Sequence, residues 1–194
     1  NQDDRPRYRR VWLKGHGRFT GRDGDQIRLE ALDDGADDGA GDPVAARHVI
    51  IATGSKARHL PAVPVDNRLV ADNEGALAFD SVPKRLTVIG AGVIGLELGS
   101  VWRRLGADVT LLEALPTFLG ACDAGVSKEA LKLFTRQGLK IVLGAKIGDV
   151  AVAPDPAGSD GEVTVNYLDA KGESHALVSD RLIVSVGRVP NTDR

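Results

Sequence analysis

The stretch Gly90–Gly95, which reads GAGVIG, constrains the fold of this chain more than any other feature. It follows LTVIG, Leu86–Gly90, an apolar run typical of a buried parallel strand. Apolar residues then recur at helical spacing, which predicts the buried face of a helix: Ile94, Leu98, Val101, Trp102 and Leu105. A G-x-G-x-x-G pattern between a strand and a helix predicts a dinucleotide-binding loop.

Each glycine of this pattern has a physical task. Gly90 permits the tight turn, Gly92 lets the backbone approach a pyrophosphate, and Gly95 lets the helix pack closely on the strand. The helix start would offer N–H groups and about half a positive charge to the phosphates. Because the chain contains 23 glycines, a glycine-rich helix start without a ligand is the alternative.

Two glutamates accompany the loop. Glu113 ends DVTLLE, the next strand, where a carboxylate can accept a hydrogen bond from a ribose 2′-hydroxyl and repel a 2′-phosphate. The following segment, ALPTFLGACD, has no Arg or Lys, so NAD is favoured over NADP, with a solvated surface residue as the alternative. Glu97 lies on the first turn of the helix, where spacing alone fits a helix-dipole position as well as a ligand contact.

The order of elements predicts the fold class. After Glu113 we expect a helix from Asp123 to Gly138, and then further strands. These strands are Leu139–Leu143, three antiparallel strands at Asp149–Ala153, Glu162–Leu168 and Ser174–Val178, and Arg181–Gly187. This pattern predicts an α/β fold, a Rossmann-type doubly wound parallel sheet with an antiparallel β-meander.

The N-terminal part is β-rich. We expect three strands, at Val11–Phe19, Gln26–Leu32 and Ala46–Gly54, with a loop at Asp33–Pro43. Three strands without a covering helix are not expected to form a domain alone. The prolines of Leu60–Asn67 predict an extended linker.

Composition limits the function classes. A net charge of −2 provides no broad basic field, which argues against a nucleic-acid partner. No apolar run approaches the roughly 20 residues of a membrane span, and the N-terminus NQDDRPRYRR does not resemble a signal peptide. Cys122 is the only cysteine, which fits a reducing, cytoplasmic location, and we interpret it as a small, partly buried side chain and not as a nucleophile.

Several longer stretches resemble the pyridine nucleotide–disulfide oxidoreductase family, in particular its flavoenzymes that oxidise dihydrolipoamide. They are GAGVIGLELGSVWRRLGADVTLLEALPTFL, VPKRL, VGRVPNT, KGHGRF, HVIIATGS and KARHLPAVPVDN. The resemblance implies both NAD and FAD as cofactors and a homodimer. It also implies, as partner, the lipoyl-bearing subunit of a 2-oxoacid dehydrogenase complex.

The resemblance also assigns residues. It implies NAD contacts at Gly90, Ala91, Gly92, Val93, Ile94, Gly95, Leu96, Glu97, Glu113, Ile147 and Gly187. Within this set Glu97 would contact the nicotinamide carboxamide, Ile147 the adenine, and Gly187 the nicotinamide end. FAD contacts are implied at Gly17, Thr53, Gly54 and Ser55. The implied domains are 1–64, the closing β-segment of the first half of an FAD domain, 65–187, the NAD-binding domain, and 188–194, the return to the FAD domain.

Departures from the family pattern limit the expected activity. The redox pair C-x-x-x-x-C, the first GxGxxG for FAD and the C-terminal His-Glu pair are absent. We therefore expect a piece of a larger flavoenzyme, without catalytic residues or metal ligands and inactive alone. Asn73 and Glu74 replace the usual Ser-Thr and have no functional interpretation. An NADH-dependent disulfide or mercuric reductase, and a non-catalytic nucleotide-binding module, are the alternatives.

Overall fold

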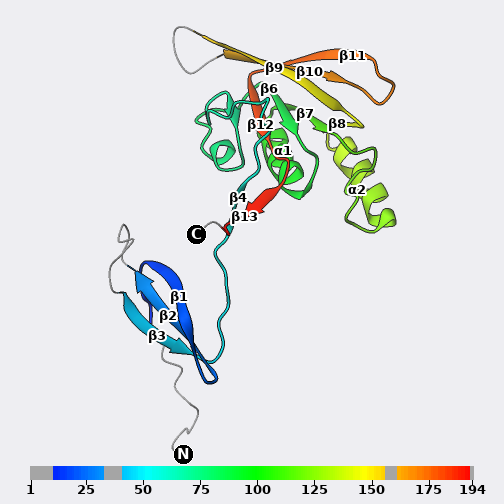
Figure 1. Cartoon of the computed structure of the whole chain (residues 1–194). Coiled ribbons are helices and arrows are strands. Elements are labelled where there is room, and N and C mark those ends of the chain that lie inside the picture. The colour runs from blue at the N-terminus through cyan, green and yellow to red at the C-terminus, as the bar shows by residue number, and fades with distance from the viewer. Residues whose placement is uncertain (1–10, 33–40, 156–160, 193–194) are drawn as a thin grey trace, which may run out of the picture. The chain divides into compact units, whose positions relative to one another are not determined.

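The computed structural model describes residues 11–32, 41–155 and 161–192. Figure 1 shows the chain. It forms two compact units, Asn1–Ala52 and Thr53–Arg194.

The first unit contains an antiparallel sheet of three strands, β1 (His16–Asp23), β2 (Gln26–Leu32) and β3 (Asp42–Ala46), in that order. The predicted third strand, Ala46–Gly54, is wrong. Its residues 47–54 are in no strand, and β3 instead runs from the last two residues of the predicted loop to Ala46, the first residue of the predicted strand. The β-branched side chains of Ile50 and Ile51 favour a strand but are 91% and 70% exposed, and no described strand pairs with them.

The second unit is built on a parallel sheet in the order β5-β12-β6-β7-β8. Its strands are β5 (Val70–Ala71), β6 (Arg85–Ile89), β7 (Asp108–Glu113), β8 (Lys140–Leu143) and β12 (Arg181–Val184). The helices are α1 (Val93–Leu105) and α2 (Ala124–Arg136), with a short 3-10 helix, η1 (Gly75–Leu77). This order agrees with the predicted strand–helix alternation. No helix among the described residues is long and apolar enough to cross a membrane.

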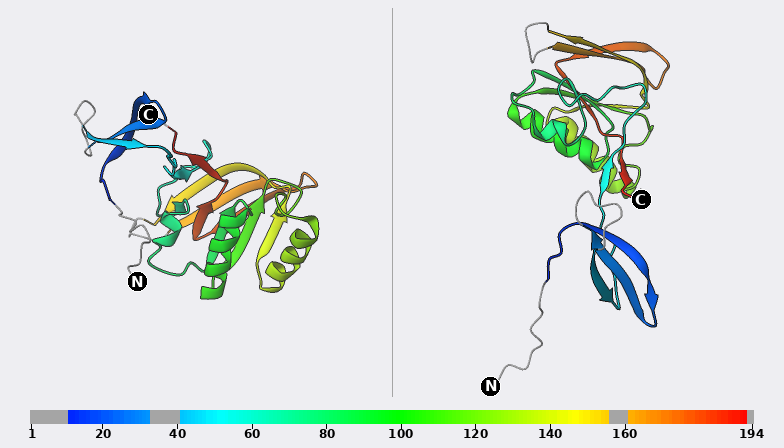
Figure 2. Two further views of the ribbon diagram at one scale, coloured as in Figure 1. Left: turned by 90° about the horizontal axis from the view of Figure 1, so that it is seen from below. Right: turned by 60° about the vertical axis from the view of Figure 1, so that its left-hand side comes forward.

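A second sheet covers the face of the parallel sheet that the helices leave open (Figures 1 and 2). It consists of β9 (Lys146–Pro154), β10 (Gly161–Leu168) and β11 (Ser174–Ser179), all antiparallel. Successive side chains of a strand point to opposite faces of the sheet, so the parallel strands contribute to two hydrophobic cores. Leu111 packs in the core on the helix side, and Leu112 in the core on the side of β9–β11. The predicted meander is confirmed, with β9 starting at Lys146 instead of Asp149.

Helix α1 presents a different face to the sheet from the one predicted. Leu98 and Trp102 are buried, but Val101 and Leu105 are 49% and 56% exposed. The sheet-facing side of the helix carries the buried glycines Gly95 and Gly99, and at Gly95 a Cβ would lie only 2.0 Å from the carbonyl oxygen of Gly90. Gly106 caps the helix in the left-handed conformation, with φ 116°.

An ionic cluster fixes the amino-terminal ends of β6 and β12. The Asp180 carboxylate accepts hydrogen bonds from the backbone N–H groups of Lys84 and Arg85, at 2.8 and 2.9 Å, and from the Arg85 guanidinium. Burial alone raises the pKa of Asp180, but the hydrogen bonds from Arg85 and Lys84 outweigh it and hold this pKa below the ordinary aspartate value.

A short two-stranded ladder lies where the chain enters and leaves the main body of the second unit. Strand β4 (Ser55–Ala57) pairs antiparallel with β13 (Arg188–Pro190). The Arg188 guanidinium donates to the Ser55 hydroxyl at 2.6 Å, to the Ser55 carbonyl, and to Asn73 Oδ1 at 3.1 Å. Asn73 thus has a structural role that its sequence position alone did not reveal.

Candidate functional site

The glycine-rich loop connects β6 to α1, and two of its glycines are required by close contacts. A Cβ on Gly90, which has φ 101°, would lie 2.2 Å from the carbonyl oxygen of Ser185. A Cβ on Gly95 would lie 2.0 Å from the carbonyl oxygen of Gly90. The tight turn and the close helix–strand packing predicted for these positions are therefore present in the structure.

The middle glycine of the loop faces open space. No atom lies within 4 Å of a Cβ built on Gly92, which is the N-cap residue of α1. No side chain caps this helix start, so the first N–H groups of α1 remain available to a ligand. An anionic group can approach the backbone here without steric obstruction.

Glu113, at the carboxyl end of β7, is tied to the loop. One oxygen of its half-buried carboxylate accepts a hydrogen bond from the N–H of Ala91 at 2.8 Å. The other accepts from the N–H of Leu115 at 2.9 Å. An ionised carboxylate has about four acceptor positions, so both oxygens can still accept a hydrogen bond from a ligand hydroxyl.

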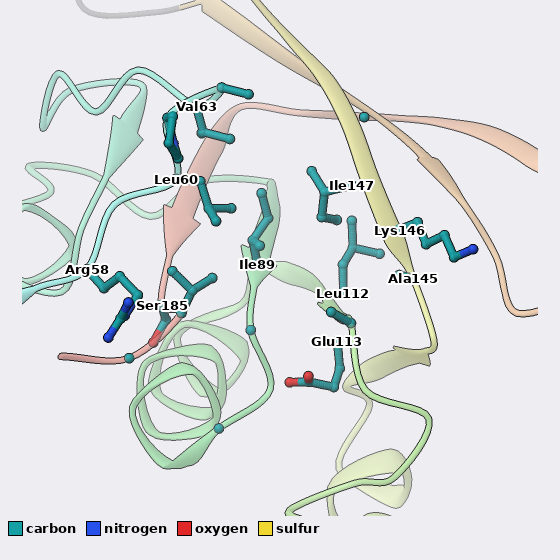
Figure 3. Close-up of a pocket in the computed structure, with 18 residues that line it drawn as sticks. Arg58, Leu60, Val63, Ile89, Leu112, Glu113, Ala145, Lys146, Ile147 and Ser185 are labelled. Carbon is teal, nitrogen blue, oxygen red and sulfur yellow. The ribbon is translucent and has the colours of Figure 1, made fainter. Parts of the chain in front are cut away.

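Loop and carboxylate open into one pocket of about 630 Å³ (Figure 3). Its walls are the carboxyl ends of β6 and β7, residues 145–148 at the start of β9, residues 185–187 after β12, and Arg58 with residues 60–63. A pocket of this size at the carboxyl ends of parallel strands is the usual ligand position in an open α/β sheet.

Apolar side chains dominate the pocket walls, and Figure 3 shows Ile147 above Leu112 and Glu113. The ionisable lining residues are Glu113, Arg58 and Lys146. Figure 3 shows Arg58 across the pocket from Glu113, while the Lys146 side chain extends away from Glu113.

The structure brings together five of the residues assigned to NAD. Lining the pocket are Gly90, Gly92, Glu113, Ile147 and Gly187. The others are distributed around the loop: Ala91, Gly95 and Leu96 are buried beside it, Ile94 is half-buried, and Val93 and Glu97 are exposed on α1.

The residues assigned to FAD lie elsewhere. Gly17 is exposed on β1, in the first unit. Thr53 Oγ1 donates to the carbonyl of Asn191 at 2.9 Å, and the backbone N–H of Asn191 donates to the carbonyl of Gly54 at 3.0 Å. Ser55 is bound by Arg188, so these three residues are engaged around the β4–β13 ladder.

Sequence reasoning missed one wall of the pocket, because residues 60–67 were predicted only as a linker. The His59 ring lies 3.2 Å from the Asp72 carboxylate and links this wall to the loop after β5. Burial alone raises the pKa of Asp72, but hydrogen bonds from the backbone of Gly75 and Glu74 and from His59 lower it below the usual value.

A group with metal-ligating side chains occurs at the β10–β11 hairpin, where Asp169, Glu173 and His175 lie close together. The Asp169 carboxylate already accepts from the backbone of Lys171 and Glu173 and contacts His175 at 3.1 Å. The Glu173 hydrogen bond is the main reason why the pKa of Asp169 is lowered. These bonds stabilise the turn between β10 and β11, which explains why Asp169 and His175 lie close together.

The parallel sheet, the glycine-rich turn and the carboxylate at the end of the second strand are the features of a Rossmann-type α/β protein. Residues 12–194 match the family model described as pyridine nucleotide-disulphide oxidoreductase, and the chain belongs to this family. The family resemblance and the fold class predicted from the sequence are thereby confirmed.

The chain is similar to curated members of this family. It is 60% identical, over 93% of its length, to a dihydrolipoyl dehydrogenase of Cupriavidus necator, and 40% identical, also over 93%, to dihydrolipoyl dehydrogenase 3 of Pseudomonas putida. It spans about a third of these relatives, 35% and 36% of their lengths. The crystal structure of LpdA from Mycobacterium tuberculosis shares the fold, with a TM-score of 0.67 at 24% identity over 92% of this chain and 37% of that one.

Proposed function

We propose that the second unit binds NAD(H) in the pocket at the carboxyl ends of β6 and β7. The proposal depends mainly on the position of Glu113. Its carboxylate lines the pocket and also accepts a hydrogen bond from Ala91 in the glycine-rich loop. The adenosine ribose would bind to Glu113, the adenine would pack against Ile147, and the pyrophosphate would lie at Gly92. The nicotinamide half would then extend towards Gly187 and Glu97.

Charge favours NAD over NADP at this position. A 2′-phosphate placed beside Glu113 would meet a carboxylate at close range, and residues 114–122 contain no Lys or Arg to compensate it. Lys146 also lines the pocket, but its side chain extends away from Glu113 (Figure 3).

We further propose that the chain is the NAD-binding part of a dihydrolipoyl dehydrogenase. The identity of 60% to the Cupriavidus necator enzyme supports this. The parent protein would bind FAD, form a homodimer and oxidise the lipoyl-bearing subunit of a 2-oxoacid dehydrogenase complex. Residues 1–64 and 188–194 would belong to its FAD domain, with Gly17, Thr53, Gly54 and Ser55 as FAD contacts, and 65–187 to its NAD domain.

Within such an enzyme the residues of this pocket bind and orient the nucleotide. The nicotinamide ring, when bound, supplies the hydride chemistry. Glu113 and the loop fix the adenosine end and the pyrophosphate, which sets where the ring lies. Glu97, which is exposed on α1 just after its first turn, would contact the carboxamide.

Calorimetric titration of the chain with NADH and NADPH tests the binding proposal. We expect saturable NADH binding and weaker NADPH binding. Equal or reversed affinities would contradict the role given to Glu113, and the absence of binding to either would contradict the proposal as a whole. The proposal for the parent enzyme is tested by expressing the full-length protein and measuring its rate of dihydrolipoamide oxidation with NAD+.

A further inference from the structure

The backbone of Arg58 is held at the end of the pocket where Gly187 lies. Ala57, the preceding residue, is paired with Arg188 in the β4–β13 ladder. The N–H of Arg58 then donates to the carbonyl of Gly187 at 3.0 Å. The position from which this side chain extends is therefore fixed by two strands that are distant in sequence.

The side chains after Ala57 alternate in direction. Arg58 and Leu60 line the pocket, whereas His59 contacts Asp72 outside it. The contact with Asp72 holds His59 on the outer side of this wall. Because neighbouring side chains point in opposite directions, Arg58 points into the pocket.

The Arg58 guanidinium is available to a ligand. In the ranges that the structure describes, its side chain has no hydrogen bond and no ion pair, and it lies across the pocket from Glu113, with the glycine-rich loop between them (Figure 3). The pocket therefore has a negative side, at Glu113, and a positive side, at Arg58.

We infer that Arg58 binds the nicotinamide-side phosphate of the dinucleotide, an inference that rests on the NAD(H) site proposed above. A ligand with its adenosine ribose at Glu113 and its pyrophosphate across Gly92 directs its second phosphate to the side of Gly187, where Arg58 extends. A planar guanidinium offers paired N–H donors that match phosphate oxygens.

A ligand series measures this contact in Arg58→Gln, with calorimetry on the whole chain. AMP contains the adenosine-side phosphate alone, ADP-ribose adds the second phosphate, and NADH adds the nicotinamide. We expect Kd to rise about tenfold for ADP-ribose and NADH, the scale of one exposed charge-assisted hydrogen bond, and to stay unchanged for AMP. Arg58→Lys should recover part of the lost affinity. Higher ionic strength should reduce the difference in Kd between Arg58→Gln and the unmodified chain.

Arg104→Gln is the matched control. It removes the same charge from the exposed surface near the end of α1, roughly 16 Å along the helix from the loop. It should bind all three ligands as the unmodified chain does, and both variants should keep the unmodified circular dichroism spectrum.

Each other result contradicts the inference. Unchanged ADP-ribose affinity in Arg58→Gln would show that Arg58 makes no phosphate contact, and a loss for NADH alone would move its contact to the nicotinamide nucleoside. If AMP lost as much affinity as NADH, Arg58 would act through its overall positive charge and not through a contact with the second phosphate. If the unmodified chain bound none of the three ligands, the proposed NAD(H) site itself would be wrong.

Discussion

Alanine at Gly95 should disturb the nucleotide site more than alanine one helical turn further on. The added methyl group of Gly95→Ala would lie 2.0 Å from the carbonyl oxygen of Gly90, whereas ordinary contacts begin at 3.4 Å. The obstructing atom belongs to the backbone, so α1 and the loop must separate by about 1.4 Å. This movement displaces the N–H groups at Gly92 from the position proposed for the pyrophosphate.

Gly99→Ala is the matched control, because a Cβ there meets side-chain atoms of Val109 and Leu111 at 3.4–3.7 Å. That change should be neutral or stabilise the helix by up to about 1 kcal/mol, the propensity difference between glycine and alanine. Gly95→Ala should lower the free energy of unfolding by about 1–3 kcal/mol, the usual cost of overpacking. It should also raise the Kd of NADH about tenfold or more.

Urea unfolding and calorimetric NADH titration of the two variants and the unmodified chain provide the comparison. Equal stabilities and equal NADH affinities of Gly95→Ala and Gly99→Ala would refute the reasoning, because α1 would then tolerate a methyl group equally well at both positions. A loss of stability without a loss of affinity would show that the position of the loop does not govern nucleotide binding.

Three further changes test other parts of the structure. Glu113→Ala should weaken NADH binding by about 1.5–3 kcal/mol and affect NADPH less, as measured by calorimetry, with the exposed Glu129→Ala as a neutral control; an unchanged NADH affinity would contradict it. In the full flavoenzyme, Glu97→Gln should slow electron transfer from flavin to NAD+ in stopped-flow experiments without loss of FAD, and an unchanged rate would leave Glu97 as a plain surface residue. Asp180→Asn should destabilise the protein at pH 7 by about 1–2 kcal/mol, since it weakens hydrogen bonds to Arg85. Because the folded-state pKa of Asp180 is lowered, this contribution is present above the ordinary aspartate pKa of about 3.9 and disappears as the pH falls through the lower folded value, so urea-unfolding curves of the two proteins should converge there.

The parts of the site that could be predicted are those whose geometry is set locally. Gly95 meets the carbonyl oxygen of Gly90 within the same strand–turn–helix, so the spacing of the glycines was sufficient to predict the close packing there. Glu113 could be found because it ends the neighbouring parallel strand, and carboxyl ends of parallel strands share one edge of the sheet.

The parts that escaped prediction depend on pairing between distant segments. Arg58 reaches the pocket because Ala57 pairs with Arg188, a partner that no local pattern identifies. The error at residues 46–54 is the reverse case. Ile50 and Ile51 have the propensity of a strand, but propensity alone cannot provide the partner strand that a ladder requires.

The pairing of β4 with β13 also has a consequence for how such a unit can be combined with others. The two segments that flank residues 58–187 run side by side and are fastened by Arg188 to Ser55, so the intervening chain begins and ends at one place. A segment with adjacent ends can be inserted into a host protein with little disturbance. The two host residues that flank the insertion need to lie only about 4.8 Å apart, the spacing between neighbouring strands. Such an insertion costs the host little chain entropy, and the same body could be inserted into any host that presents two neighbouring chain ends.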